Sequence, residues 1–115
     1  MNTDMDKKVI EAFFHRIEEI GEVLMSTKAR LFFHNTCVAQ WYLGGIIINT
    51  SDYSGYSEYR DLILDMIPET YDYVPIDGIP ENMPNLIKYA QYNCNWVCKG
   101  KKEETSCGCE ENKCS

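Results

Sequence analysis

The stretch Leu31–Ser51 contains no lysine, arginine, aspartate or glutamate, although both of its neighbours are densely charged. A soluble chain places such an uncharged run in its interior. The length would also suit a membrane span, which needs about 20 apolar residues. The polar residues exclude that interpretation, because each would need a partner inside lipid: His34, Asn35, Thr36, Gln40, Asn49 and Thr50. We therefore expect a buried central segment in a soluble domain and no contact with a membrane.

Signature motifs of nucleotide-binding and hydrolytic enzymes are also absent. The sequence has no G-x-x-x-x-G-K-[ST], no G-x-G-x-x-G, no G-x-S-x-G and no H-E-x-x-H. Carboxylates are plentiful, but the sequence alone cannot place two of them across a cleft as an acid–base pair. We therefore predict that the protein is not an enzyme.

The first eight residues, MNTDMDKK, lack the apolar stretch of a secretory signal. We therefore expect a cytoplasmic, reducing location, in which the six cysteines are thiols or metal ligands before they are disulfides. A chain of 115 residues has room for one domain with one core.

Basic residues are nearly missing from residues 51–85, which hold eight acids and one base, Arg60. The net charge of this segment equals that of the whole chain, −7. A net-acidic chain repels phosphate backbones, so direct binding of nucleic acid is not expected. Such a segment suits a basic surface on a protein partner.

Five of the eight tyrosines lie in the same segment. Tyrosine is common in the energetic centres of protein interfaces, because it gives a large contact area for little loss of side-chain entropy. A solvated acidic surface with its tyrosines in the core is the equally weighted alternative. We predict a partner-binding surface that consists of Asp52, Tyr53, Tyr56, Asp61, Asp72 and Tyr73.

In its small size, net acidity and tyrosine content, the chain resembles the composition of some virus-encoded inhibitors of host nucleic-acid-handling proteins. The resemblance implies an inhibitor that occupies the nucleic-acid site of its target.

Helical periodicity predicts four helices. Apolar residues recur at three and four positions over residues 4–25, and they run nearly all round a second helix over 28–43. Two further helices are expected over 58–67 and from Pro84 to about Cys98. The β-branched run Ile46–Ile48 favours an extended segment, paired with Tyr71–Ile76 as an antiparallel ribbon in which Pro75 restricts the second strand to an edge.

These elements predict a mainly α fold, a small single-domain bundle of about four helices with room for a short two-stranded β-ribbon. Residues 1–100 would form the helical domain, and residues 101–115 a cysteine-rich tail that folds back onto the last helix.

Five of the six cysteines lie in the last 22 residues. Cys94 and Cys98 are four apart in a predicted helix and so share one face. Cys107 and Cys109 can add two thiolates on a tight turn at Gly108, and four thiolates in a tetrahedron describe a structural zinc site. We predict zinc at Cys94, Cys98, Cys107 and Cys109, with disulfides, free thiols and replacement of one ligand by Cys114 left open. In this alternative function, the cysteine-rich C-terminus of a zinc module is the interaction surface.

His34 and Cys37 lie three apart on the second predicted helix. A Cys–His dyad would make the protein a thiol-dependent enzyme, with Cys109 as another candidate thiol. No third group that could orient the dyad is evident, so two buried side chains are the preferred interpretation.

Overall fold

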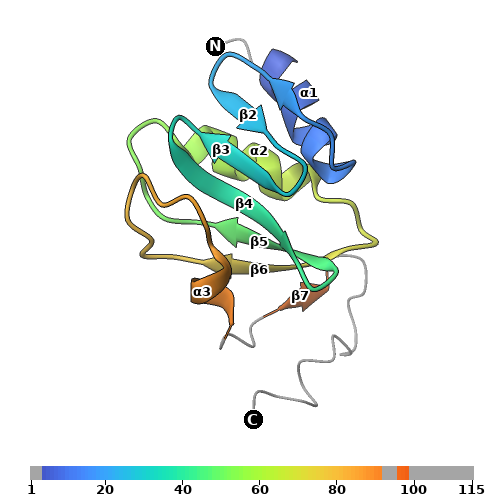
Figure 1. Ribbon diagram of the computed structural model, residues 1–115, viewed down its shortest axis with the longest axis vertical. Helices are drawn as coiled ribbons and strands as arrows, with labels where there is room; N and C mark the ends of the chain where they lie inside the picture. Colours follow the sequence, from blue (N-terminus) through green and yellow to red (C-terminus); the bar gives the residue numbers. More distant parts are fainter. Residues whose placement is uncertain (1–3, 92–95, 99–115) are drawn as a thin grey trace.

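The computed structural model describes residues 4–91 and 96–98, which fold into one mixed β-sheet with helices on both of its faces (Figure 1). The helices are α1 (Asp4–Phe14), α2 (Ser57–Met66) and α3 (Ile87–Ala90). The strands are β1 (Glu19–Ile20), β2 (Leu24–Ser26), β3 (Arg30–Phe33), β4 (Thr36–Tyr42), β5 (Gly45–Asn49), β6 (Asp72–Ile76) and β7 (Val97–Cys98).

The prediction of a mainly α helical bundle is wrong, because the centre of the molecule is a seven-stranded sheet in the order β1-β2-β3-β4-β5-β6-β7. All of β5 and every residue of β4 except Tyr42 are buried. A strand that is covered on both faces loses the alternation of apolar and polar residues, so its sequence looks like that of a buried helix. The predicted helix over 28–43 is therefore β3 and β4. The expectation that Leu31–Ser51 forms the interior is confirmed.

The first predicted helix exists but ends early. Its apolar side chains are buried as expected, at Val9, Ile10, Phe13 and Phe14. The backbone then leaves the helix at Arg16, whose φ of 62° lies in the left-handed region. Residues 19–25, which the predicted helix included, belong to the β1–β2 hairpin instead.

Strands β1 to β5 form an antiparallel meander, and β6 then pairs with β5 in parallel. Parallel neighbours need a crossover connection, which α2 supplies. The predicted pairing of Ile46–Ile48 with Tyr71–Ile76 is thus confirmed in its partners but not in its direction. Strand β7 pairs with Asp72 and Tyr73 alone, so Pro75, which has no N–H to donate, lies beyond its end.

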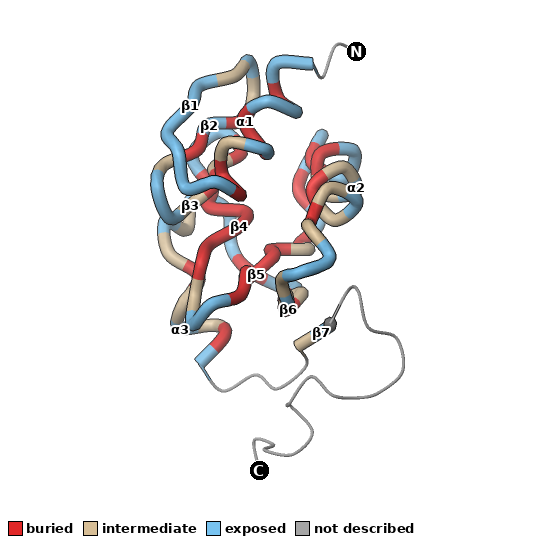
Figure 2. Tube along the Cα trace, turned by 90° about the vertical axis from the view of Figure 1, so that its right-hand side faces the viewer, coloured by how far each residue is buried: buried red, intermediate tan, exposed pale blue. Residues whose placement is uncertain are grey.

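The sheet carries one apolar cluster on each face. On the inner face, α1 and α2 pack against side chains such as Leu31, Val38 and Ile48. On the outer face, the loop over residues 77–86 and α3 cover Cys37, Ile47 and Val74. Figure 2 shows α2 with its buried stretches toward the sheet and its exposed stretches away from it.

Asp6 joins α1 to the β1–β2 hairpin. Its Oδ1 accepts hydrogen bonds from the backbone N–H groups of Val23 and Leu24, both at 3.0 Å. The Asp6 side chain is fully buried, and its Oδ2 has no hydrogen-bond partner in the part of the chain that the structure describes. Gly21 is needed beside it, because a Cβ at that position would lie 2.7 Å from Oδ1.

Candidate functional site

The exposed side of α2 is acidic. Glu58, Asp61 and Asp65 are exposed and lie three and four residues apart, so they share one side of the helix. Tyr59 and Ile63 are buried on the opposite side. The third predicted helix, over 58–67, is therefore confirmed to within a residue at each end, and its solvent-facing side carries three carboxylates.

The hydroxyl of Tyr59 is affected by several carboxylates. Burial raises the pKa of its hydroxyl, and the carboxylates of Asp6, Glu58 and Glu22 raise it further. Glu22 is exposed in the turn between β1 and β2, so the hairpin also contributes a carboxylate to the surroundings of Tyr59. We call Glu58, Asp61 and Asp65 together the acidic face.

Arg60 is the one base on α2, and it does little to neutralise this charge. Its Nε lies 3.3 Å from Oδ1 of Asp61, whose side chain is 71% exposed. An exposed ion pair of this kind is weak and leaves most of the carboxylate to solvent. Arg60 therefore does not screen Asp61 from solvent.

The structure separates the predicted aspartates. Asp61 lies on the acidic face, while Asp52 follows β5 and Asp72 begins β6. Because β5 and β6 are parallel, Asp52 and Asp72 lie beyond opposite ends of β5, a five-residue strand about 16 Å long. All three side chains are exposed, but they do not form one cluster.

Tyr53 and Tyr56 are buried and hold the backbone instead of facing solvent. The Tyr53 hydroxyl donates to the carbonyl of Ile79 and accepts from Asn49 Nδ2, and the Tyr56 hydroxyl donates to the carbonyl of Asn49 at 2.7 Å. Burial also raises the pKa of Tyr56. Tyr73 is half-buried against the inner cluster. The structure therefore presents the predicted tyrosines as packing residues.

A buried polar network, which was not predicted from the sequence, anchors the loop over residues 77–86. Gln40 Oε1 accepts from the N–H of Leu86 at 2.7 Å, and the Ser51 hydroxyl accepts from the N–H of Ile79 at 2.7 Å. Thr36 accepts from the N–H of Asn82 at 2.8 Å. The sequence does contain an indication of this network. The uncharged central stretch holds polar residues, and each of them needs a hydrogen-bond partner when it is buried.

Cys37 is unsuited to nucleophilic catalysis. Its thiol is fully buried, lies 3.3 Å from the carbonyl oxygen of Ala39, and has its pKa raised to about 12 by burial. His34 is exposed in the turn after β3, where its ring packs on Phe33 at 4.5 Å between centroids. The predicted Cys–His pair is therefore not assembled as a dyad, because a thiolate is the reactive form and this thiol stays protonated.

The cysteine prediction falls largely outside the described residues, where Cys94, Cys107 and Cys109 lie. Cys98 lies in β7, opposite Asp72, so the helix predicted from Pro84 to Cys98 does not reach its predicted end and is confirmed only as the short helix α3. Within residues 4–91 and 96–98, no group of three or more His, Cys, Asp or Glu side chains could hold a metal ion. The described residues thus form neither a helical bundle nor a metal-binding group, and zinc at the four cysteines stays a prediction.

Every helix in the described part of the chain is too short or too polar to cross a membrane. The chain was also compared with family models, with curated proteins and with solved structures, and none of these comparisons gave a match. Its function must therefore be inferred from its own residues.

Proposed function

We propose that the protein is a non-catalytic binding protein, which holds a basic surface of another protein with its acidic face. The observation that carries this proposal is the position of Glu58, Asp61 and Asp65 on the solvent-facing side of α2. The buried side of the helix is packed on the sheet, so the carboxylates stand on a rigid element.

A row of carboxylates favours a particular kind of binding. Each exposed charge pair contributes only about 0.2–1 kcal/mol, so several must act together. Their combined field mainly raises the association rate with an oppositely charged surface and is weakened by salt. A basic protein surface is therefore a better match than an apolar groove or a nucleic acid.

The same chemistry supports an inhibitory role. A protein that handles nucleic acid carries a basic surface for phosphates, and an acidic protein of this size can occupy it. The sequence has a net charge of −7, which disfavours contact with the nucleic acid itself.

The test is affinity capture with the immobilised full chain, followed by stepwise elution with salt and identification of the bound proteins by mass spectrometry. The double variant Glu58→Lys/Asp61→Lys should lose the basic proteins that the original chain retains at low salt. The matched control is Asp77→Lys/Glu81→Lys, which makes the same change in net charge on the exposed 77–86 loop.

Capture that is unchanged in the α2 variant would refute the proposal. Equal loss in the two variants would also refute it, because binding would then follow net charge and not the acidic face. Circular dichroism of both variants verifies that each has folded.

A further inference from the structure

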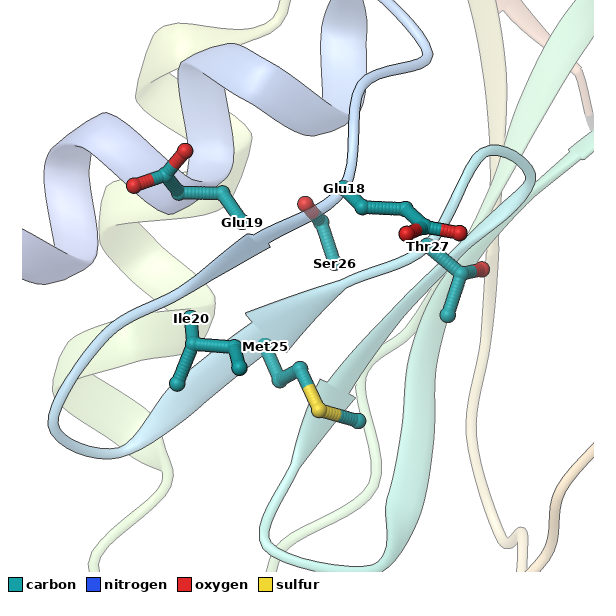
Figure 3. Close-up of a pocket in the computed structure, with 6 residues that line it drawn as sticks. All are labelled: Glu18, Glu19, Ile20, Met25, Ser26 and Thr27. Atoms are coloured by element: carbon teal, nitrogen blue, oxygen red, sulfur yellow. The ribbon is translucent and has the colours of Figure 1, made fainter.

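The edge of the sheet at β1 combines features that are unusual on a solvated surface. Ile17, Ile20 and Met25 have exposed fractions of 53%, 72% and 39%, and all three belong to the β1–β2 hairpin or the segment leading into it. Ile20 and Met25 are direct cross-strand partners, so their side chains lie on the same face. Figure 3 shows them next to each other, on the side of the hairpin away from Glu19 and Ser26.

The apolar row continues into the outer face of the sheet. Met25 lies opposite Phe32 on β3, and Phe32 is half-buried against the outer cluster. The loop over residues 77–86 and α3 cover the cluster near β4 to β6, but Ile20 and Met25 lie at the uncovered end. A groove of about 550 Å³ lies there, lined by Glu18, Glu19, Ile20, Met25, Ser26 and Thr27 (Figure 3).

The backbone of Ile20 faces outward. The N–H of Gly21 donates to the carbonyl of Leu24 at 2.8 Å, so these two residues occupy a hydrogen-bonded position of the ladder, although the N–H of Leu24 donates to Asp6 instead. Hydrogen-bonded and non-hydrogen-bonded pairs alternate along an antiparallel ladder, which makes Ile20 and Met25 a non-hydrogen-bonded pair. The N–H and C=O of Ile20 therefore point away from β2, at an edge that pairs with no other strand in the described part of the chain.

The charges at this edge indicate which kind of protein segment binds there. Residues 17–27 contain Glu18, Glu19 and Glu22 and no base. Two copies joined through β1 would bring these carboxylates against each other, and like charges across strands are destabilising. A lysine or arginine opposite Glu19 would instead form a favourable cross-strand pair.

We infer that the β1 edge binds an extended segment of a partner protein, in which a large apolar side chain is followed by lysine or arginine. The segment adds a strand to the sheet and pairs its backbone with that of Ile20. Its apolar side chain lies over Ile20 and Met25, and its bases lie opposite Glu18 and Glu19. This surface is separate from the carboxylates of α2.

The probe is a fluorescein-labelled peptide of sequence VKKVKKV, with VEEVEEV as its acidic counterpart, titrated with the full chain and read by fluorescence anisotropy. VKKVKKV should bind at least tenfold more tightly than the acidic peptide. Ile20→Pro removes the outward N–H without removing a hydrogen bond of the fold, since proline is tolerated on edge strands. It should weaken binding by about tenfold, which is the loss expected when one or two backbone pairings are broken.

Three controls separate the outcomes. Ile20→Val keeps the N–H and an apolar side chain, and it should bind as the original chain does. Ile20→Lys folds with its N–H intact but places a positive charge on the edge, and it should also lose the peptide. Glu58→Lys/Asp61→Lys should retain it, so a failure of the proposed α2 function would leave this result unchanged.

Equal binding of VKKVKKV to the original chain and to Ile20→Pro would overturn the inference, as would no binding at all. Loss of the peptide in the α2 variant alone would assign it to the acidic face and would also overturn the β1 site. Light scattering that shows a dimer dispersed by Ile20→Pro would make a second copy the occupant and overturn the choice of a basic partner.

Discussion

Replacement of Asp6 by alanine should lower the free energy of unfolding by about 3 kcal/mol. Asp6 Oδ1 accepts from the N–H groups of Val23 and Leu24, and a hydrogen bond to a charged group contributes about 1.5–3 kcal/mol. The substitution also removes Oδ2, which is buried and has no partner among the described residues. Its removal recovers a desolvation cost on the order of 1–3 kcal/mol, which offsets part of that loss.

Asp6→Asn separates the hydrogen bonds from the charge. The asparagine oxygen can still accept from both N–H groups, so the loss should fall to about 1 kcal/mol. Lys7→Ala is the matched control, because Lys7 is exposed on the same helix and its loss should change stability by less than about 0.5 kcal/mol.

The assay is equilibrium unfolding in urea, followed by the fluorescence of tryptophan, with hydrogen exchange of individual amides as the local readout. In Asp6→Ala, the amides of Val23 and Leu24 should lose protection before those of β4. A loss of less than about 1 kcal/mol, with unchanged exchange at these two amides, would refute the view that Asp6 clamps α1 to the hairpin.

Three further changes test other parts of the structure. Burial raises the pKa of Cys37 from its ordinary value of 9.0 to about 12, so the folded protein keeps a proton that the unfolded chain releases. The free energy of unfolding that this proton contributes should be fully present below pH 9 and should decline between about pH 9 and 12. In urea unfolding, Cys37→Ala should lose less stability over this pH range than the original chain, and parallel curves of stability against pH would contradict this expectation. Leu43 has a φ of 53° and Gly44 a φ of 79°, as in a type I′ turn, so Leu43→Asn should stabilise the protein by about 0.5–1 kcal/mol and raise its Tm. Tyr53→Phe removes the hydroxyl that links Asn49 to Ile79 and should cost about 1–3 kcal/mol in urea unfolding, whereas Tyr73→Phe should be nearly neutral.

The sequence supported the prediction of what is buried better than the prediction of secondary structure. The uncharged stretch over residues 31–51 is the interior, as its composition implies. Its assignment to a helix failed because β4 is covered on both faces, which removes the period of two that identifies a strand. The helix at residues 57–66 was predictable, since only one side of α2 is covered and its apolar stripe remains visible.

The error over residues 17–26 has another cause. Ile17, Ile20 and Leu24 are spaced as on a helix, but Ile17 and Ile20 are exposed, and only Leu24 faces the core. An apolar residue on the surface is counted by a periodicity argument as if it were buried. The features that make the β1 edge a candidate binding surface are therefore the ones that misled the helix prediction.

The candidate site was predictable in its charge but not in its residues. Composition located the acids of residues 51–85, but it could not show that Tyr53 and Tyr56 bond to backbone carbonyls inside the core. Glu22 is distant from Tyr59 in the sequence, and the fold of the hairpin is what lets its charge act on that residue. Interactions of this kind depend on the tertiary fold, which no local pattern encodes.

The two proposed surfaces differ in what they can contribute to binding. The acidic face offers charge with little apolar area, so it should act on the association rate, which salt reduces. The β1 edge offers backbone groups and apolar area at Ile20 and Met25, so it should act mainly on the dissociation rate. For a partner that engages both, surface plasmon resonance should show a salt-dependent association rate that flattens in Glu58→Lys/Asp61→Lys and a dissociation rate that increases in Ile20→Pro. If both variants changed the same rate constant, the two surfaces would not have the separate roles that their chemistry assigns to them.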